Sequence, residues 1–157
     1  MAVENISQTA IVRLPRPLVW KCLRDTEILS QCIAGCEQFE ADTDNRFRIT
    51  VRFKLGPLSH VFKGTVMITD IQHESSLKFR RGSYKPYLGS GAFAGSVQLG
   101  NDPKGTRMAI DVQVEAPAAI LKLVKIFNPM SSQKRLKDFT ALFEQAVNAR
   151  TGTASAS

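Results

Sequence analysis

The chain has 157 residues and a net charge of +7 at pH 7, and 43% of its residues are hydrophobic. These values indicate one globular domain that can bury a core, and no apolar run approaches the roughly 20 residues of a transmembrane helix. The first residues, MAVENISQTAIV, also lack the basic and apolar regions of a secretory signal. We therefore expect a cytoplasmic protein with a single domain over residues 1–150 and a disordered polar tail over residues 151–157.

Three cysteines, Cys22, Cys32 and Cys36, lie in the first part of the chain. An odd number of cysteines without a secretory signal is typical of reduced cytosolic thiols. A structural zinc site needs four ligands at recognisable spacing, and the two histidines, His60 and His73, are distant from the cysteines in sequence. We therefore expect buried or half-buried thiols, and neither a metal nor another cofactor.

The N-terminal part of the chain predicts a strand followed by two short helices. Residues 6–14 form the strand, and the prolines of the PRP sequence at residues 15–17 end it. The next segment, LVWKCLRD at residues 18–25, has the apolar spacing of a helix. A second helix continues through residues 27–32, and the Asp-Thr pair at residues 25–26 offers it an N-cap.

Strands follow in quick succession, and their prediction depends on alternating apolar and polar residues. The clearest case is residues 46–55, RFRITVRFKL, where Phe, Ile, Val and Leu alternate with Arg, Thr and Lys. One charged face indicates an antiparallel strand with one side in water. Residues 87–99 are rich in glycine, which marks bends, bulges or the close approach of another element. The predicted strands are residues 36–41, 46–55, 58–70, 77–81, 87–99 and 106–115.

The C-terminal part predicts a long amphipathic helix over residues 128–148. Asn128 is a good N-cap, and Pro129 suits the first helical position. Its apolar residues recur at spacings of three and four and must be buried against another element: Met130, Leu136, Phe139, Leu142, Phe143, Ala146 and Val147. The preceding residues 116–127 are ambiguous, since this nearly all-apolar piece can cap a pocket, touch a membrane or extend the core.

The order of strand, two short helices, about six strands and a long helix predicts an α+β fold. In it, a curved antiparallel sheet of about six to seven strands surrounds the C-terminal helix. Several motifs accompany this order: Val19-Trp20 with Leu23 and Asp25, CIAGCE at residues 32–37, LGP at 55–57, FKGTV at 62–66, and Gly89, Gly91 and Gly95. With them, residues 6–147 resemble the helix-grip fold of the SRPBCC (START/Bet v 1-like) superfamily. Within that superfamily, the chain is similar to the family of proteins like the G subunit of carbon monoxide dehydrogenase.

The chain departs from the family pattern at three places. Ala34 stands where the family has proline, and MAID at residues 108–111 replaces a pattern that contains tyrosine. APAA at residues 116–119 replaces a helix entry that starts with glycine. These differences bear on the role that the subfamily implies. The order of elements that indicates the superfamily is complete.

The resemblance implies a cavity between the sheet and the C-terminal helix that binds an apolar small molecule, quinone-like or lipid-like. Relatives accompany molybdenum-containing carbon monoxide dehydrogenases and similar hydroxylases, so we expect a non-enzymatic binding protein that is accessory to such a redox system. Any membrane contact would be peripheral, at the inner face of the membrane. Two alternatives stay open: a polyketide cyclase or aromatase-like enzyme, and an assembly factor that docks an acidic partner through a basic face.

The candidate ligand-binding residues come from the inward faces of the predicted strands and from the C-terminal segments. Seven of the nine phenylalanines, Phe47 among them, would converge there, although an ordinary solid core would look the same. No nucleophile elbow, phosphate loop or histidine-glutamate metal motif is present, so we assign no catalytic residue. The candidates are Phe53, His60, Phe62, Phe79, Arg81, Phe93, Met108, Ile110, Leu121, Val124, Phe127, Phe139 and Phe143.

Two of these candidates are polar and have a second interpretation. His60 shares the parity of the apolar set and can hydrogen-bond a ligand oxygen, but it lies near a strand end, where polar residues usually meet water. Arg81 shares the parity of Phe79 and can bind a carboxylate or a quinone-type oxygen at a cavity mouth. We prefer the solvated interpretation for both residues, with Arg81 in a turn after its strand.

A third set of residues carries much of the positive charge. These residues fall on the outward faces of neighbouring predicted strands, where they would form one broad basic surface: Arg46, Arg48, Arg52, Lys54, Lys63, Lys78 and Arg80. Proteins that bind single-stranded nucleic acid have exposed aromatic residues among their basic residues. Such aromatic residues are missing here, so we expect no nucleic-acid partner. An acidic protein or an anionic membrane surface fits better, and a merely solubilising face is the common alternative.

Overall fold

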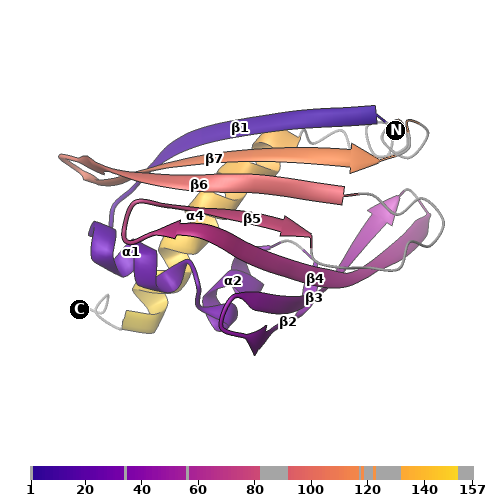
Figure 1. Cartoon of the computed structure of the whole chain (residues 1–157), viewed down its shortest axis with the longest axis horizontal. Helices are drawn as coiled ribbons and strands as arrows, with labels where there is room; N and C mark the ends of the chain where they lie inside the picture. Colours follow the sequence, from indigo (N-terminus) through magenta and orange to yellow (C-terminus); the bar gives the residue numbers. More distant parts are fainter. Residues whose placement is uncertain are drawn as a thin grey trace.

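The computed structural model describes residues 2–33, 35–55, 57–81, 92–116, 118, 122 and 132–151. A first strand, β1 (Ala2–Val12), leads into two short helices, α1 (Arg16–Cys22) and α2 (Thr26–Cys32). Six strands follow, and a long helix, α4 (Ser132–Thr151), comes last (Figure 1). The six strands are β2 (Cys36–Thr43), β3 (Arg46–Leu55), β4 (Leu58–Gln72), β5 (Ser76–Arg81), β6 (Ala92–Asp102) and β7 (Gly105–Ala116).

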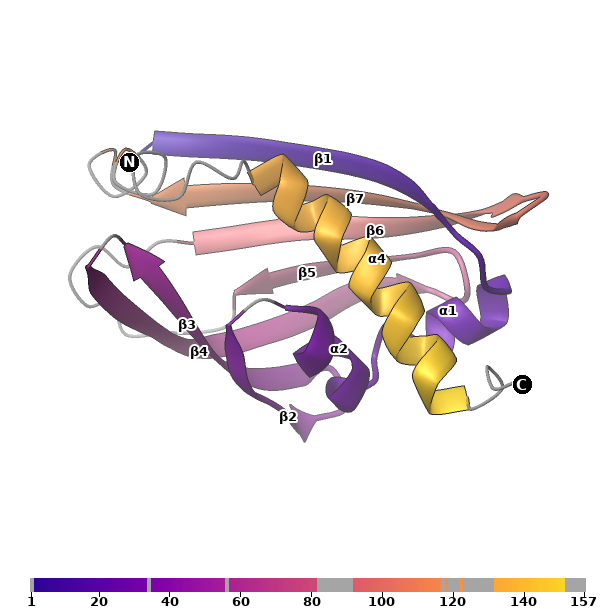
Figure 2. The same ribbon diagram turned by 180° about the vertical axis from the view of Figure 1, so that it is seen from behind.

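The seven strands form one antiparallel sheet in the order β1-β7-β6-β5-β4-β3-β2. Register shifts interrupt the pairing of β2 with β3 and of β4 with β5, and such bulges bend a sheet and increase its twist. Figure 2 shows α4 running diagonally across the inner face of this sheet, with α2 beside it. The predicted α+β helix-grip architecture is confirmed.

Most predicted elements are present, with boundaries that differ by a few residues. The strand over residues 46–55 has the predicted bounds, whereas β1 starts at Ala2 rather than at residue 6. The reason is tertiary pairing, since Ala2 to Asn5 continue the ladder with the last residues of β7. The predicted helix start at Asn128 and Pro129 lies outside the described residues, as does most of the predicted tail. The domain boundaries therefore stay a prediction.

The core lies between α4, the inner face of the sheet and the two short helices. Phe143 and Val147 of α4 are fully buried, together with Met108 of β7 and Val12 of β1. Val19 of α1 and Ile28 of α2 belong to the same cluster. The predicted apolar stripe of α4 is thus confirmed at its centre. The predicted face was too wide, because Leu142 keeps 38% of its surface exposed while Thr140 is buried.

The buried threonines satisfy their hydroxyls within the chain. Thr140 donates to the carbonyl of Lys137 at 2.8 Å, one turn earlier in α4. Thr106 of β7, fully buried, donates to the carbonyl of Leu14 at 2.7 Å. Since a buried hydroxyl without a partner is costly, these bonds make the two positions compatible with an apolar core.

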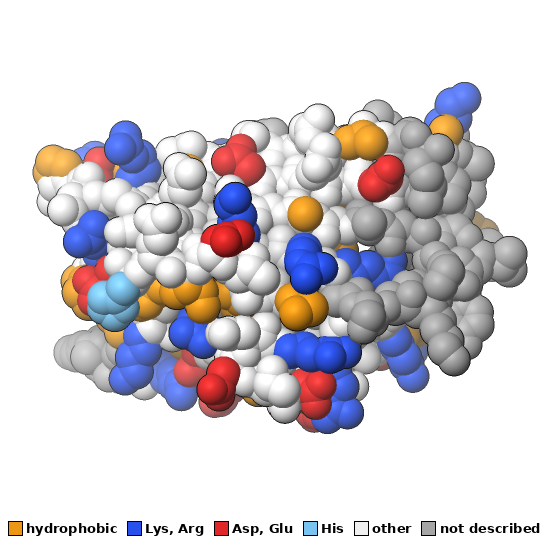
Figure 3. Space-filling view, in the orientation of Figure 1, with side chains coloured by type: hydrophobic (Ala, Val, Ile, Leu, Met, Phe, Trp, Pro, Cys, Tyr) orange, Lys and Arg blue, Asp and Glu red, His pale blue; other side chains and the backbone are white. Residues whose placement is uncertain are grey.

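The outer face of the sheet carries charges of both signs. In Figure 3, which looks onto this face, Lys and Arg side chains lie among Asp and Glu side chains. On β7, Arg107, Asp111 and Glu115 are exposed, as the alternating pattern predicted. The sheet therefore has one apolar face and one solvated face, which is the usual arrangement for an antiparallel sheet covered by helices on one side.

Two polar links hold α4 against the rest of the chain. Glu144 accepts a hydrogen bond from the backbone N–H of Arg13 at 2.5 Å and pairs with the Arg13 guanidinium at 3.3 Å. Burial raises the pKa of Glu144, but the hydrogen bonds and the charge of Arg13 outweigh it, so this pKa lies below its ordinary value. A carboxyl whose folded-state pKa is lowered stabilises the fold at neutral pH and loses that contribution as the pH falls.

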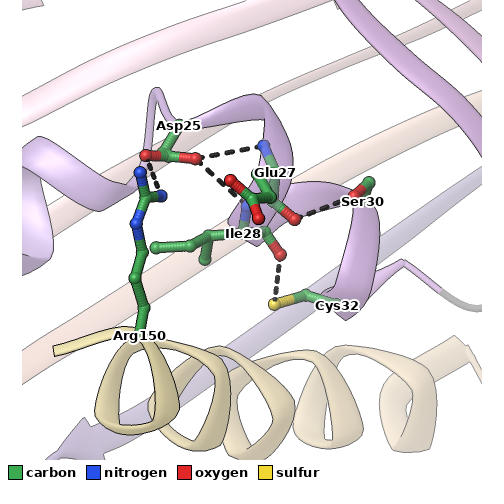
Figure 4. Close-up of polar contacts among 6 residues, drawn as sticks. All are labelled: Asp25, Glu27, Ile28, Ser30, Cys32 and Arg150. Carbon is green, nitrogen blue, oxygen red and sulfur yellow. Dashed lines mark hydrogen bonds and ion pairs between the residues drawn. The ribbon is translucent and has the colours of Figure 1, made fainter. Parts of the chain in front are cut away.

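The second link joins the far end of α4 to α2 (Figure 4). Asp25 caps α2, where its Oδ1 accepts hydrogen bonds from the backbone N–H groups of Glu27 at 3.0 Å and Ile28 at 3.2 Å. Its Oδ2 pairs with the guanidinium of Arg150 near the end of α4. The predicted N-cap at residues 25–26 is therefore Asp25, and one carboxylate connects the two helices.

The contrast between two neighbouring positions of α4 gives a test of its packing. Phe143→Ala should lower the free energy of unfolding by about 3–5 kcal/mol, because it removes a fully buried ring and leaves a cavity. Leu142→Ala, on the exposed flank, should change it by less than about 1 kcal/mol. Urea unfolding followed by circular dichroism measures both. Similar losses for the two variants would contradict the orientation of α4.

The double role of Asp25 gives a second test. Asp25→Ala should cost about 1–2 kcal/mol of unfolding free energy, because it removes both the cap and the ion pair. Arg150→Ala should cost at most about 1 kcal/mol, because the pair is partly exposed. In the double variant, the effect of Arg150→Ala should disappear when measured by urea unfolding. Fully additive losses would show that the two side chains do not interact.

Candidate ligand-binding site

The width of the sheet explains why a cavity forms under α4. Seven strands spaced by about 4.8 Å make a sheet roughly 30 Å wide, whereas one helix with its side chains is only about 10–12 Å across. In the structure, α4 contacts β1 and α2, and α2 contacts β2. Helices therefore cover the sides of the inner face, and side chains must meet over the strands in the middle.

A cavity of about 210 Å³ lies over these middle strands. Most of its wall residues come from the strands β2 to β6, from α2, and from the C-caps of the two short helices. Phe93 of β6 and Phe139 of α4 complete it, so the wall joins α4 to the sheet. The wall is formed by Leu23, Leu29, Ile33, Phe39, Phe47, Ile49, Val66, Ile68, Leu77, Phe79, Phe93, Val97 and Phe139.

All thirteen wall side chains are hydrocarbon, so they offer a ligand no hydrogen-bond donor or acceptor. Apolar cavities of about 150 Å³ in other proteins stay dry and accept a benzene-sized guest. This cavity is larger, which suits a substituted ring or a short alkyl chain. The interaction that these side chains can make with a ligand is to remove its apolar surface from water.

One wall position explains a glycine in β6. The ring of Phe79 in β5 packs over Gly95, since a Cβ at Gly95 would lie 2.5 Å from the ring's Cζ. The backbone carbonyl oxygen of Asp111 would lie at 2.4 Å. Both distances are shorter than any normal contact, so a side chain at this position would displace the backbone as well as the ring. The sequence indicated a bend, a bulge or a close approach in this strand, and at Gly95 the structure shows the close approach.

Three predicted ligand-binding residues, Phe79, Phe93 and Phe139, line the cavity, and so does Phe47. Met108, Ile110 and Phe143 are not among the wall residues and belong to the packed core, which also includes Phe47. They lie farther toward the part of the sheet that α4 covers. The expected convergence of phenylalanines is therefore divided between a cavity wall and a solid core, and the ligand-binding roles stay predictions.

For the remaining candidates, the structure describes either the backbone alone or nothing. Phe53 and Phe62 belong to strands β3 and β4, but their side chains are not described, and the same holds for His60. Leu121, Val124 and Phe127 lie in the segment between β7 and α4, also outside the described residues. Most of residues 116–127, which from the sequence could cap a pocket, also lies in this segment.

Sequence reasoning missed the wall residues of the two short helices and β2. Leu29 and Ile33 lie in α2 and at its C-cap, and Leu23 is the C-cap of α1. Their apolar character was visible, but only the packing of α2 beside α4 brings them to the cavity. The useful signal would have been the shared apolar face of two consecutive short helices, which must be buried somewhere.

Arg81 is buried, with 9% of its surface exposed, so the preferred interpretation of a solvated turn was wrong. The strand β5 still pairs at this residue, since Arg81 lies opposite Val66 of β4. Because the strand continues, the pleat turns Arg81 to the same inner face as Leu77 and Phe79. Its Nε and Nη2 atoms are shielded from solvent.

The strands of the predicted basic surface are neighbours, but acidic side chains of β2 lie beside three of its arginines. Asp42, Glu40 and Glu37 form ion pairs with these arginines at 3.7, 3.7 and 2.8 Å. The sequence prediction did not count these acids, so the surface over β2 and β3 is mixed rather than uniformly basic. The paired arginines are Arg46, Arg48 and Arg52; Lys63, Lys78 and Arg80 are exposed, and the side chain of Lys54 is not described.

The thiols follow the sequence prediction. Cys22 and Cys32 are buried and Cys36 is half-buried. Burial raises the pKa of the Cys32 thiol to about 11, so it stays protonated at neutral pH. In the described part of the chain, no three His, Cys, Asp or Glu side chains cluster as metal ligands would. Among the described helices, none has the length and hydropathy to cross a membrane.

The chain is similar in fold to several solved structures. A conserved protein from Geobacillus kaustophilus is 17% identical, with 94% of this chain and 96% of that chain covered and a TM-score of 0.76. The Zhui aromatase/cyclase from Streptomyces sp. R1128 is 10% identical, with 99% and 100% covered and a TM-score of 0.69. Ara h 8.0201 is 12% identical, with 94% and 99% covered and a TM-score of 0.63.

These structures share the helix-grip architecture, and at such low identity they indicate the fold alone. A search of curated protein sequences found no match. A family model, in contrast, matches residues 9–126, which span β1 to the segment after β7 and most of the chain. On this match and on the order of its elements, the chain belongs to the CoxG family, which is named for the G subunit of carbon monoxide dehydrogenase.

Proposed function

We propose that this protein binds an apolar small molecule, quinone-like or lipid-like, in the cavity between α4, α2 and the middle strands. The observation that carries the proposal is the 210 Å³ cavity with a wall of thirteen hydrocarbon side chains. Burial of apolar ligand surface is worth about 25 cal/mol per Å², and it is the interaction that these thirteen described side chains offer a ligand. The protein acts as a carrier or holder of its ligand and performs no chemistry on it.

We further propose that the bound molecule serves a redox enzyme of the molybdenum hydroxylase or carbon monoxide dehydrogenase type. Membership of the CoxG family supports this role, because the family is described as a subunit of carbon monoxide dehydrogenase. The site of action would be cytoplasmic. The exposed cations Lys63, Lys78 and Arg80 on the outer face would contact an acidic region of the enzyme or the anionic inner face of the membrane.

A cyclase- or aromatase-like enzyme is the second candidate. The observation that favours it is Arg81, a buried cation on the inner face of β5 that can polarise a ligand carbonyl. The Zhui aromatase/cyclase shares the fold of this chain, which shows that the architecture accommodates such a protein. The hydrocarbon wall favours binding over catalysis, because an acid or base is absent from the thirteen residues described there.

Filling the cavity tests the binding proposal. Val66→Phe places a ring on the cavity wall, so we expect the affinity for a side-chain-free naphthoquinone and for n-hexylbenzene to fall at least about tenfold, while overpacking costs about 1–3 kcal/mol of stability. Val61→Phe is the matched control, since Val61 lies in the same strand and borders a depression on the outer face. Isothermal titration calorimetry measures both variants.

Equal affinity in the two variants would place the ligand elsewhere. Native mass spectrometry of the wild-type protein, isolated without detergent, gives an independent measurement. We expect an additional mass that organic solvent extracts. The proposed function would be wrong if the isolated protein carried no ligand and also took up neither probe.

A further inference from the structure

We infer that the outer edge of β1 is a docking surface for a second copy of this chain. Two β1 strands would pair antiparallel about a twofold axis at Ser7, the middle residue of the strand, and would join two sheets into one. None of the residues that line the cavity belongs to β1, so this surface does not depend on the proposed ligand.

The strand β1 is the last strand at one edge of the sheet (Figure 1). It pairs with β7 along its whole length, without a register shift. In an antiparallel ladder, the backbone N–H and C=O groups of every second residue point away from the neighbouring strand. In the part of the chain that the structure describes, no strand lies on that side of β1. Such an edge is a template for pairing with another strand.

The opposite edge of the sheet has features that prevent such pairing. Two register shifts interrupt the ladder of β2 with β3, and β2 carries the acids Glu37, Glu40 and Asp42. Bulges and charges are common means of avoiding association between sheet edges. The strand β1 is longer, contains no proline and has a single charged residue, Glu4. The chain therefore protects the edge at β2 and leaves β1 able to accept a strand.

The exposed side chains of β1 are complementary to those of a second β1. Val3 and Ile11 keep 50% and 40% of their surface exposed, although both are large and apolar. When two copies of β1 pair antiparallel over their full length, Ala2 faces Val12 of the second copy. In the same register, Val3 faces Ile11 of the second copy, at both ends of the ladder. Side chains that face each other in this way lie about 5 Å apart, so each would cover the other.

Charge and shape both permit this pairing. Like charges that face each other would destabilise it, but Glu4 faces Ala10 of the second copy, and Asn5 faces Thr9. The helix α4 packs on the inner face of the sheet and contacts both β1 and α2. Figure 2 shows that α4 runs from β1 toward α2, so its length extends away from the outer edge of β1.

Sedimentation equilibrium of the untagged wild-type protein, with no other protein present, tests for the second copy. We expect an average mass that rises with protein concentration from the mass of one chain to that of two. The mass of a single chain at every concentration up to about 1 mM would overturn the inference. The edge of β1 would then be left to a strand of a different protein.

Two single variants test whether β1 forms the interface. Ile11→Lys places a charge in the apolar pair and should weaken the dimer at least about tenfold. Ile71→Lys is the matched control, because Ile71 of β4 is 38% exposed and three strands separate β4 from β1. This control adds the same charge and should leave the dimer unchanged. Equal effects of the two variants, or no effect of Ile11→Lys, would place the interface elsewhere.

Two double variants test the register at physiological salt, where distant charges are screened. Like charges face each other in Val3→Lys/Ile11→Lys, and opposite charges face each other in Val3→Lys/Ile11→Glu. The first variant should therefore dimerise at least about tenfold more weakly than the second. Equal dimerisation would show that the twofold pairing at Ser7 is wrong.

Circular dichroism checks that each variant folds. The variant Val3→Lys/Ile11→Lys brings a like charge beside Arg107, which lies opposite Ile11 in β7. If this variant does not fold, the comparison of Val3→Lys/Ile11→Glu with Val3→Lys alone decides. The double variant should form the tighter dimer, and an equal or weaker dimer would contradict the register.

Discussion

The packing of α4 on the inner face of the sheet is the contact on which the rest of the structure depends. Phe143 lies at its centre, fully buried, and Val147 continues the same stripe one turn later. The sheet alone would expose its inner face, and α4 alone would expose its stripe. Since α4 is far narrower than seven strands, this one contact creates both the solid core and the gap beside it.

The polar links determine how α4 is held, and through it the shape of the cavity. Glu144 ties the helix to Arg13 after β1, and Arg150 ties it to Asp25 at the start of α2. Both helices supply cavity wall, α4 through Phe139 and α2 through Leu29. A carboxylate that caps one helix and pairs with the other therefore connects the two helices that supply these walls. The two links lie in the C-terminal half of α4, whereas Phe139 lies nearer its start.

The parts of the fold that the sequence predicted are those with a local cause. Alternation over residues 46–55 is a property of neighbouring residues, and β3 has the predicted bounds. The preferred prediction of a solvated Arg81 was wrong, because the end of β5 depends on the pairing of Arg81 with Val66. No local sequence pattern indicates this pairing. Leu29 and Ile33 were missed for a similar reason, since only tertiary packing brings α2 to the cavity. The family resemblance predicted that a cavity exists, but it could not predict which side chains line it.

The cavity also links ligand binding to stability. A hydrocarbon group that fills the 210 Å³ of apolar space between the helices and the middle strands would gain packing contacts with its wall. A hydrocarbon guest that makes those contacts should stabilise the fold according to ligand concentration and affinity. The stabilisation must reach α2 and α4 together, because both contribute wall residues and Asp25 joins them. In the proposed function, the ligand would cover the part of the inner face of the sheet that the helices leave open.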